Sequence, residues 1–408
     1  MRTAPVRGTL DYLPEEAELR SAMQNIILQT YEKYGYSRVE APILEDVENL
    51  DKSDGGENLN LIFKILKRGE KFEKALAANE ELADLGLRYD LTLPLVRYFA
   101  NNKAKLGTPF KAIQTGPVFR AEKPQKGRMR QFIQCDIDVL GDSSENIEKE
   151  LIFVTAEAIR SLGFKDFKIL VNDRLILKDM LSSFGFEEAD LDSVCITFDK
   201  LDKVGPEGVA KELKDKDFAK DAIENLTEFL KNGDMSLEGV AKICKGNEAT
   251  RLKRIIDDTN KLAAEQYDVV FTPSLVRGQG YYTGIVFEIQ VEGYPGSVGG
   301  GGRYDNMVEK FIGEKVPAVG FSIGFERVAQ ILIEQGRTIP GQKEKIALIY
   351  ESDADFTKVL NRASELGERY RVAAIQKEKN MGKLFKRLEA QQFVKAFDFE
   401  DATIKELR

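Results

Sequence analysis

Three arginines stand in apolar or glycine-rich surroundings, where a charged side chain is unusual unless it has a partner or a task. Arg120 follows Gly-Pro-Val-Phe, Arg277 lies in Leu-Val-Arg-Gly-Gln-Gly-Tyr-Tyr, and Arg327 lies in Ile-Gly-Phe-Glu-Arg-Val. Taken alone, each is most simply a structural ion pair. Taken together, they suit a reaction in which fixed positive charge meets several phosphate groups.

The composition restricts that chemistry further, because the 408 residues include no histidine. Ser–His and Cys–His nucleophiles and His-ligated zinc are therefore excluded. The three cysteines are far apart and form no Cys-x-x-Cys pair, which argues against a disulfide framework or a zinc ribbon. Activation of a carboxylate by ATP remains possible, since the nucleophile is already ionised at neutral pH and needs no base. Arginine and Mg²⁺ suit that reaction, and no set of protein side chains is predicted to hold a metal.

A net charge of −8 gives no general attraction to nucleic acid, so RNA binding would need a local basic surface. Residues 120–130 and 377–387 are two such candidates, although a run of charges is more often a solvated face. No apolar run has the length of a membrane span, and the first residues contain no signal-peptide core. The expected location is the cytoplasm, without membrane contact.

Two apolar-alternating segments, 110–122 and 129–140, predict antiparallel strands joined by a basic loop. In the second segment one face is apolar, and the other carries Phe132, Gln134, Asp136 and Asp138. That polar face fits either the floor of a pocket or a solvated surface, and the strand alone does not decide between them.

Other elements must position these residues. An amphipathic helix is predicted over 15–34, a glycine-rich turn over 296–302 and a helix over 320–335. The glycine run lacks the P-loop pattern and suggests a close approach of backbone to a bound substrate. The sequence predicts a catalytic domain in two parts, 1–174 and 266–337, with a helical insertion at 175–265 between them and a short α/β domain at 343–408.

Four motifs give a specific resemblance. Residues 119–132 and 320–327 resemble motifs 2 and 3 of class II aminoacyl-tRNA synthetases, and 275–284 and 300–305 resemble two signatures of the histidyl-tRNA synthetase family. Residues 87–92 also fit that family, and the helix before Tyr-Gly-Tyr resembles its dimer-forming motif 1. The resemblance implies an α+β fold: a class II antiparallel sheet flanked by helices, with a helical insertion and a small C-terminal α/β domain.

The resemblance also implies a role for each matching position. Arg120, Arg277 and Arg327 would be catalytic, with Arg277 at the α-phosphate, where class II enzymes often use a metal. ATP would be bound by Arg120, Glu122, Arg128, Phe132 and Arg327. Histidine would be bound by Asp90, Leu91, Thr92, Arg120, Gln134, Asp138, Arg277, Tyr281 and Tyr282. Within that group, Asp138 and Tyr282 would read the donor and acceptor of the imidazole ring.

The implied reaction is the ATP-dependent, Mg²⁺-assisted activation of L-histidine and its transfer to tRNA(His) by a homodimer. Two departures from the family qualify it. Gln279-Gly280 replaces the Leu-Asp pair that is usual before the two tyrosines. The C-terminal domain is short, so tRNA is expected to be contacted at its acceptor stem, while contact with its anticodon is left open. One alternative is a non-catalytic paralogue such as the regulatory subunit of ATP phosphoribosyltransferase. Another is an enzyme that charges an acceptor other than tRNA.

Overall fold

The computed structural model describes residues 1–51, 60–124, 128–277, 281–337 and 343–407. Two compact units divide the chain, Met1–Arg337 and Thr338–Arg408, and each is described by itself. Within the described residues, no helix is long and apolar enough to cross a membrane. Residues 338–342, between two of the predicted domains, and the pair Gln279-Gly280 lie outside the described residues.

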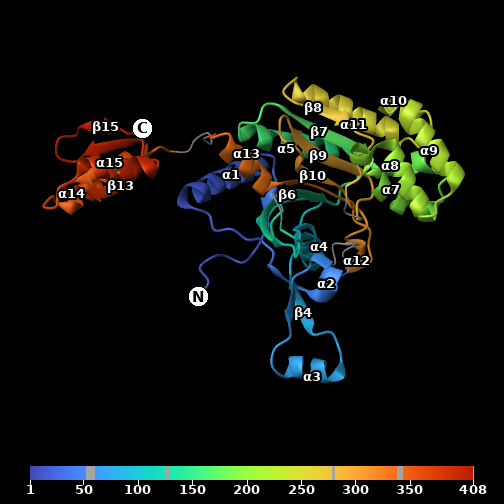
Figure 1. Ribbon diagram of the computed structural model, residues 1–408, viewed down its shortest axis with the longest axis horizontal. Helices are drawn as coiled ribbons and strands as arrows, with labels where there is room; N and C mark the ends of the chain where they lie inside the picture. The colour runs from blue at the N-terminus through green and yellow to red at the C-terminus, as the bar shows by residue number, and fades with distance from the viewer. Residues whose placement is uncertain (52–59, 125–127, 278–280, 338–342, 408) are drawn as a thin grey trace. The chain divides into compact units, whose positions relative to one another are not determined.

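An eight-stranded sheet forms the centre of the first unit (Figure 1). Its strands, in spatial order, are β1 (Ser37–Arg38), β5 (Phe110–Phe119), β6 (Gln131–Leu140), β11 (Ala318–Ile323), β10 (Ser297–Arg303), β9 (Ile285–Val291), β7 (Phe167–Asp173) and β8 (Asp268–Phe271). The strands from β5 to β7 are all antiparallel, while β1 and β8 pair in parallel at the two edges. The predicted α+β fold with an antiparallel sheet is confirmed.

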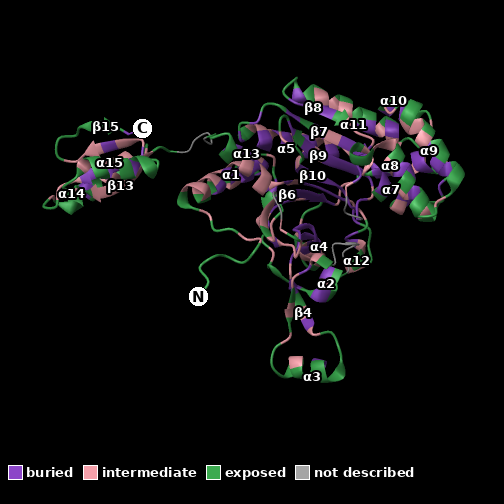
Figure 2. Cartoon of the chain, viewed as in Figure 1, coloured by how far each residue is buried: buried purple, intermediate pink, exposed green. Residues whose placement is uncertain are grey.

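Helices α1 (Pro14–Lys33), α5 (Glu145–Ser161), α11 (Glu248–Ala263) and α13 (Phe325–Glu334) pack on this sheet and on one another. Helix α1 begins one residue before the predicted segment 15–34, with Pro14 in its first turn followed by two glutamates, which suit a helix N-terminus. It buries Met23, Ile27, Leu28 and Tyr31. Figure 2 shows buried residues concentrated in the strands and on the inner sides of these helices.

Two local predictions were wrong. The glycine run is strand β10 and not a turn, and it pairs with β9 on one side and β11 on the other. Residues 318–323 form strand β11, so the helix predicted over 320–335 begins only at Phe325. Glycine gives no side-chain periodicity, and the apolar alternation of a buried strand resembles one face of a helix over so few residues.

The region predicted as a helical insertion does consist of helices after β7. They are α6 (Arg174–Ser183), α7 (Leu191–Phe198), α8 (Leu201–Asp215), α9 (Lys220–Asn232), α10 (Leu237–Ala241) and α11. Its separation as a subdomain stays a prediction, because these helices belong to the same compact unit as the sheet.

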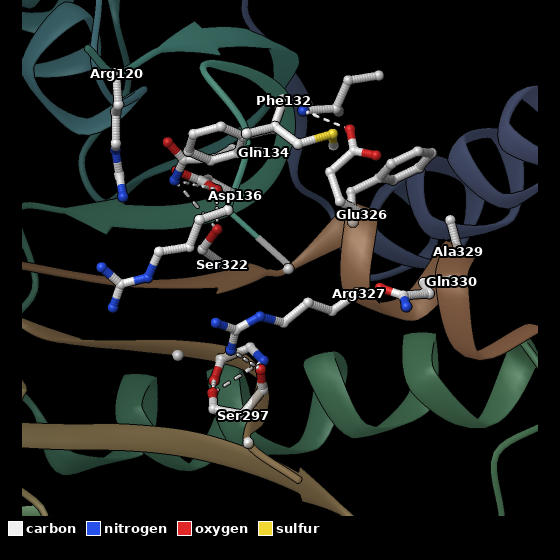
Figure 3. A pocket seen from close by; sticks show the side chains of 18 of the residues that line it. Arg120, Phe132, Gln134, Asp136, Ser297, Ser322, Glu326, Arg327, Ala329 and Gln330 are labelled. Atoms are coloured by element: carbon white, nitrogen blue, oxygen red, sulfur yellow. Dashed lines mark hydrogen bonds between the residues drawn. The ribbon is translucent and has the colours of Figure 1, made fainter. Parts of the chain in front are cut away.

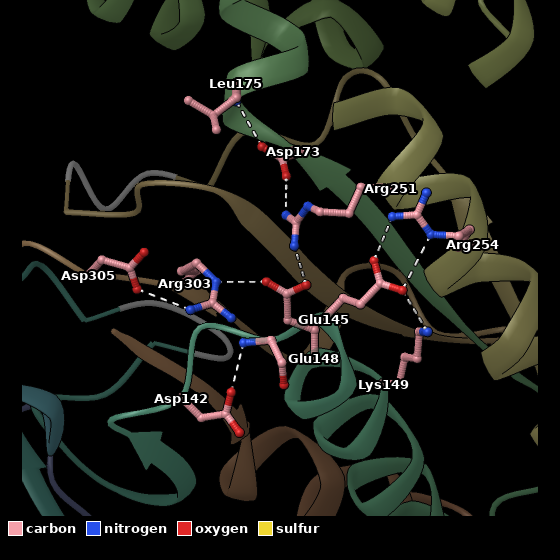
Figure 4. Close-up of polar contacts among 11 residues, drawn as sticks. Asp142, Glu145, Glu148, Lys149, Asp173, Leu175, Arg251, Arg254, Arg303 and Asp305 are labelled. Carbon is pink, nitrogen blue, oxygen red and sulfur yellow. Dashed lines mark hydrogen bonds and ion pairs between the residues drawn. The ribbon is translucent and has the colours of Figure 1, made fainter. Parts of the chain in front are cut away.

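A buried ion-pair network connects α5 and α11 with the ends of β7 and β10 (Figure 4). Glu148, which is fully buried, accepts from Arg303 Nε at 2.7 Å and from Arg251 Nη1 at 2.6 Å. Arg251 Nη2 also donates to Asp173 at 2.8 Å. Breaking a buried pair typically costs about 3–5 kcal/mol, so the network fixes the end of β10 relative to the helices.

A smaller three-stranded sheet extends from the first unit. It consists of β2 (Leu44–Asp46), β4 (Ala83–Leu87) and β3 (Lys64–Leu66), with α2 (Val47–Asp51) beside β2 and α3 (Glu70–Ala78) at the far end. Helix α4 (Thr92–Asn102) follows β4, and α12 (Glu309–Ile312) follows β10. Figure 2 shows that α3 is largely exposed.

The second unit is a small α/β domain, as predicted. Its sheet has the order β13 (Arg371–Gln376), β12 (Lys345–Tyr350), β14 (Lys395–Asp398) and β15 (Ile404–Glu406). Helices α14 (Phe356–Gly367) and α15 (Met381–Ala390) complete it, and Leu384 and Leu388 of α15 enter its core.

Candidate active site

A cavity of about 1270 Å³ opens on the sheet of the first unit, and all three candidate catalytic arginines line it. Figure 3 shows Arg120 and Arg327 reaching into the same space from different sides. Arg120 follows β5, Arg277 precedes β9, and Arg327 lies in the first turn of α13. The sheet therefore brings Arg120 together with two arginines that lie more than 150 positions later in the sequence.

Most of the other predicted site residues also lie in this wall. The full set present is Thr92, Arg120, Glu122, Arg128, Phe132, Gln134, Asp138, Arg277, Tyr281, Tyr282 and Arg327. Asp90 and Leu91 are not in the wall but lie buried beside it, each 1% exposed. The Leu91 carbonyl accepts a hydrogen bond from Gln114 Nε2 at 2.7 Å, so this residue supports the chain rather than facing the cavity.

Arg120 and Phe132 come from paired strands and meet at the cavity. The centre of the Arg120 guanidinium lies 4.9 Å from the centroid of the Phe132 ring, and its Nε donates to the Tyr89 carbonyl at 3.1 Å. The charge of Arg120 is therefore held by a ring and a neutral carbonyl. In the described part of the chain it forms no ion pair, which leaves it available for an anionic ligand.

Arg277 is held by a carboxylate and by a glycine. Its Nη1 donates to Glu288 of β9 at 3.0 Å, and a Cβ on Gly300 of β10 would lie only 2.4 Å from the same nitrogen. The glycine is thus required by the close approach of the guanidinium to the strand. Burial opposes the charge, but Tyr282 and Glu288 raise the pKa of Arg277 above its ordinary value.

Arg327 takes its position from the preceding strand pair. Its Nη1 donates to the carbonyl of Ser297 at the start of β10. Because that partner is a neutral carbonyl, the positive charge is not neutralised there. Arg128, which also lines the cavity, forms an ion pair with Glu122 at 3.4 Å.

One end of the cavity has the features of an imidazole pocket. Tyr304 donates its hydroxyl to Asp138 Oδ1 at 2.6 Å, while Asp138 Oδ2 has no hydrogen-bond partner among the described residues. The rings of Tyr281 and Tyr282 pack beside it with centroids 4.8 Å apart. Burial raises the pKa of Asp138 to about 7, although the Tyr304 hydroxyl opposes this by donating to the carboxylate.

A second group of acceptors lies next to this pocket. Ser322 donates to Asp136, and Gln134 Nε2 donates to the same carboxylate at 3.3 Å. Gln134, which lines the cavity, and Asp90, which is buried beside it, each have one oxygen, Oε1 and Oδ2, without a hydrogen-bond partner in the described structure. Burial raises the pKa of Asp90 to about 6, and burial together with the charge of Asp138 raises that of Asp136 well above its usual value.

The cavity also contains residues to which the sequence argument gave no role. They include Asp136, Glu288, Ser297, Tyr304, Ser322 and Glu326. For Asp136 a signal was present, because it shares a strand face with Phe132, Gln134 and Asp138. Tyr304 stood within a quoted signature, but nothing local in the sequence predicts its contact with Asp138.

No group of three or more Cys, Asp or Glu side chains in the described residues has a geometry that could hold a metal ion. The cavity carboxylates Glu122 and Glu288 each lie against an arginine, at 3.4 and 3.0 Å. A metal in this cavity would therefore depend largely on ligands that arrive with the nucleotide.

A sheet that is antiparallel from β5 to β7, with the helix α13 that follows it and with arginines presented to one cavity, is the architecture of a class II aminoacyl-tRNA synthetase. The family model for histidyl-tRNA synthetase matches residues 8–328. Histidine–tRNA ligase of Leifsonia xyli subsp. xyli is 40% identical over 416 residues, covering 98% of this chain and 95% of that protein. The chain belongs to the histidyl-tRNA synthetase family.

Solved structures agree on the fold. Histidyl-tRNA synthetase from Nostoc sp. PCC 7120 superimposes with a TM-score of 0.81 and 26% identity, covering 100% of this chain and 95% of that one. A Bacillus halodurans C structure described as ATP phosphoribosyltransferase regulatory subunit/histidyl-tRNA synthetase has a TM-score of 0.77 over 98% and 97% of the two chains. At 18% identity the second likeness shows the fold alone, so it gives no support to the regulatory alternative.

Proposed function

We propose that this cavity joins L-histidine to ATP as histidyl-adenylate and then passes the histidyl group to tRNA(His). Membership of the histidyl-tRNA synthetase family supports the overall activity, an ATP-dependent ligation of histidine to tRNA. The observation that carries the assignment of roles is the convergence of Arg120, Arg277 and Arg327 on one cavity.

In the first step, a carboxylate oxygen of histidine attacks the α-phosphorus of ATP, and pyrophosphate leaves. The carboxylate is ionised at neutral pH, so the protein supplies position and positive charge and no base. Arg120 and Arg277 would contact the α-phosphate and the substrate carboxylate, while Arg128 and Arg327 would hold the β- and γ-phosphates. Phe132 would stack on the adenine, and Glu122 would accept from its amino group.

Histidine would be selected by the polar end of the cavity. Asp138 Oδ2 is a free acceptor for one ring N–H, and the Tyr282 hydroxyl would serve the other ring nitrogen. An amino acid without those ring groups would leave buried polar atoms unpaired, which discriminates more strongly than pocket size. The ammonium group would meet Gln134, Thr92 and Asp90.

Mg²⁺ would enter with the nucleotide. This ion keeps several waters and binds mainly through substrate phosphates and one or two carboxylates. Among the carboxylates that line the cavity, Glu122 and Glu288 each have an arginine partner, which limits their share of the coordination. The ion would add positive charge at the phosphates, while this chain's arginines orient them.

In the second step, a ribose hydroxyl at the end of the tRNA attacks the carbonyl carbon of the adenylate, and AMP leaves. The segment between β5 and β6 contains Lys123 and Arg128, and Arg128 lines the cavity, which supports a contact of this segment with the acceptor stem. Lys383 and Lys386, both exposed on α15, are the candidates for contact with the anticodon end. This reaction would take place in the cytoplasm.

A homodimer is supported by an apolar face of the small sheet. Leu44 and Leu85 are 50% and 37% exposed. Leu44 pairs with Leu87, and Leu85 pairs with Ile65, so the four side chains share one face of that sheet. Such a patch is typical of a subunit interface, and a second copy of this chain would cover it.

Two assays of the purified chain test this function. Histidine-dependent exchange of pyrophosphate into ATP is expected without tRNA, and transfer of labelled histidine to tRNA(His) is expected when tRNA is added. Exchange without transfer would indicate a different acceptor. Absence of both would favour the regulatory alternative.

A further inference from the structure

Residues near the start of the chain also form part of the cavity wall. Gly8, Thr9, Leu10 and Tyr12 line the cavity, as does Arg20 of α1. The Gly8 carbonyl accepts from the backbone nitrogen of Arg130 at 2.7 Å, which joins this segment to the loop before β6. The N-terminal residues therefore contact the part of the cavity that contains Phe132.

The carboxylate of Glu326 connects that segment with two other elements. Arg20 donates to both of its oxygens, Nη1 to Oε2 at 2.6 Å and Nη2 to Oε1 at 2.7 Å. The Ile133 amide donates to Oε1 at 3.0 Å, and the Tyr12 hydroxyl donates to Oε2 at 3.3 Å. One side chain thus receives bonds from the N-terminal segment, from α1 and from β6.

Arg20 packs against two aromatic rings. The centre of its guanidinium lies 3.9 Å from the centroid of the Tyr12 ring and 4.9 Å from that of Phe325. The Arg20 and Glu326 side chains are only 10% and 15% exposed. A bidentate arginine–carboxylate pair in so little solvent has one geometry, which a lysine cannot reproduce.

Two residues of this hydrogen-bonded group are adjacent in the sequence to residues proposed to bind ATP. Glu326 directly precedes Arg327, and Ile133 directly follows Phe132. Figure 3 shows Glu326 on α13 beside Phe132, while Arg327 extends in another direction toward Ser297. The Glu326 carboxylate therefore sets the separation between a proposed adenine-stacking ring and a proposed phosphate-binding arginine.

We propose that Tyr12, Arg20 and Glu326 form a latch that positions Phe132 and Arg327 for ATP. This inference rests on the proposed roles of those two residues in ATP binding. The latch residues act through their neighbours and are positioning residues. Their loss is expected to weaken ATP binding selectively and to leave histidine binding at the other end of the cavity unchanged.

The alternative is that the Arg20–Glu326 ion pair only stabilises the fold, and a second ion pair of the chain serves as a matched control for it. Arg97 of α4 donates to Glu45 of β2 through Nε at 2.7 Å and through Nη2 at 2.8 Å, and the Glu45 side chain is 2% exposed. This second bidentate, largely buried pair lies outside the cavity wall. Arg20→Lys and Arg97→Lys each remove a bidentate arginine–carboxylate pair, the first at the cavity and the second outside it.

The experiment measures KM for ATP and for histidine in pyrophosphate exchange, with melting temperatures for each variant. Arg20→Lys is expected to raise KM for ATP about tenfold, equivalent to about 1.4 kcal/mol, with KM for histidine within twofold of wild type. Tyr12→Ala should act in the same direction, because it removes the ring that holds Arg20. Arg97→Lys should leave both KM values unchanged, even if its melting temperature falls as much.

Three results would overturn the latch: an unchanged KM for ATP in Arg20→Lys and Tyr12→Ala, an equal rise in Arg97→Lys, or a parallel rise in both KM values. Phe132→Ala and Arg327→Ala separate this from the proposed function. If those two variants raise KM for ATP and the latch variants do not, the latch alone is wrong. If they also leave KM for ATP unchanged, the proposed ATP-binding roles are wrong.

Discussion

Arg277 lies between the Glu288 carboxylate at 3.0 Å and the bare Cα of Gly300, and its own backbone has a φ of 63°. A residue with a side chain pays about 1–3 kcal/mol for such a conformation, which persists only where the surroundings fix it. The strain, the carboxylate and the glycine together hold one guanidinium at the cavity. This arrangement suits a group that must be in place before the phosphate charge develops.

Replacing Arg277 with alanine is expected to lower kcat of pyrophosphate exchange at least about a hundredfold, or about 2.7 kcal/mol, by analogy with the loss of one preorganised oxyanion donor. The measurement is exchange at saturating ATP and histidine. A variant that exchanges at the wild-type rate would show that Arg277 has no part in the reaction.

Tyr304 gives a second prediction at this scale, on pH dependence. Asp138 must be ionised to accept from the imidazole, and its pKa is about 7, so kcat/KM for histidine should fall as pH drops below that value. The Tyr304 hydroxyl stabilises the ionised form and thereby lowers the pKa. In Tyr304→Phe the pKa therefore rises, and the acid limb of the profile should move to higher pH.

The imidazole of the free substrate histidine titrates near pH 6.5, but this ionisation affects the wild-type and Tyr304→Phe profiles equally. A difference between the wild-type and Tyr304→Phe profiles therefore reports the enzyme. Superimposable profiles would show that the Asp138–Tyr304 pair does not control histidine binding.

At the scale of elements, strand β10 lets the side chains of other elements reach the substrate. A Cβ on Gly302 would lie 2.8 Å from the Tyr282 ring, and one on Gly300 would lie 2.4 Å from Arg277. On neighbouring β11, a Cβ on Gly320 would lie 1.8 Å from Asp138 Oδ1. The glycines thus make room for the three groups proposed to contact the substrates.

Gly300→Ala is accordingly expected to displace the guanidinium of Arg277 and to lower exchange by about tenfold or more, because misplacing a catalytic group can cost up to about a hundredfold. The group it meets is the end of a flexible side chain, so the melting temperature should change little. Gly107→Ala is the control, since a Cβ there meets no atom within 4 Å. Equal exchange rates in the two variants would refute this account of β10.

At the scale of the whole molecule, the residues proposed for adenylation and those proposed for anticodon contact belong to different compact units. The adenylation cavity lies within residues 1–337, whereas the basic face of α15 belongs to the second unit. Every residue proposed for adenylation belongs to the first unit, so exchange is expected to be independent of the second unit, whereas tRNA charging would use both.

The double substitution Lys383→Glu/Lys386→Glu is expected to leave exchange unchanged and to raise KM for tRNA(His) about tenfold at low salt, with a smaller effect as salt increases. Lys358→Glu/Arg362→Glu, at two exposed positions on α14 of the same unit, is the control for the same change in net charge. If the control raises KM as much, α15 is not a specific contact surface.

The sequence predicted much of the fold because strong periodicity reports the faces of an element. The alternation along β6 placed Phe132, Gln134 and Asp138 on one face, and that face lines the cavity. The glycine strand was missed for the same reason, since residues without side chains show no alternation. The roles of individual site residues stay predictions until the kinetic variants are measured.

By itself, the sequence determined the kind of chemistry: a chain without histidine, with arginines in apolar settings, can assist an ionised carboxylate through fixed charge alone. Only the tertiary structure decided which groups meet. Tyr304 reaches Asp138 across 166 residues, and Arg20 reaches Glu326 across 306. Local patterns describe the faces of one helix or strand, whereas such contacts depend on the order of strands in the sheet and on the helices packed against it.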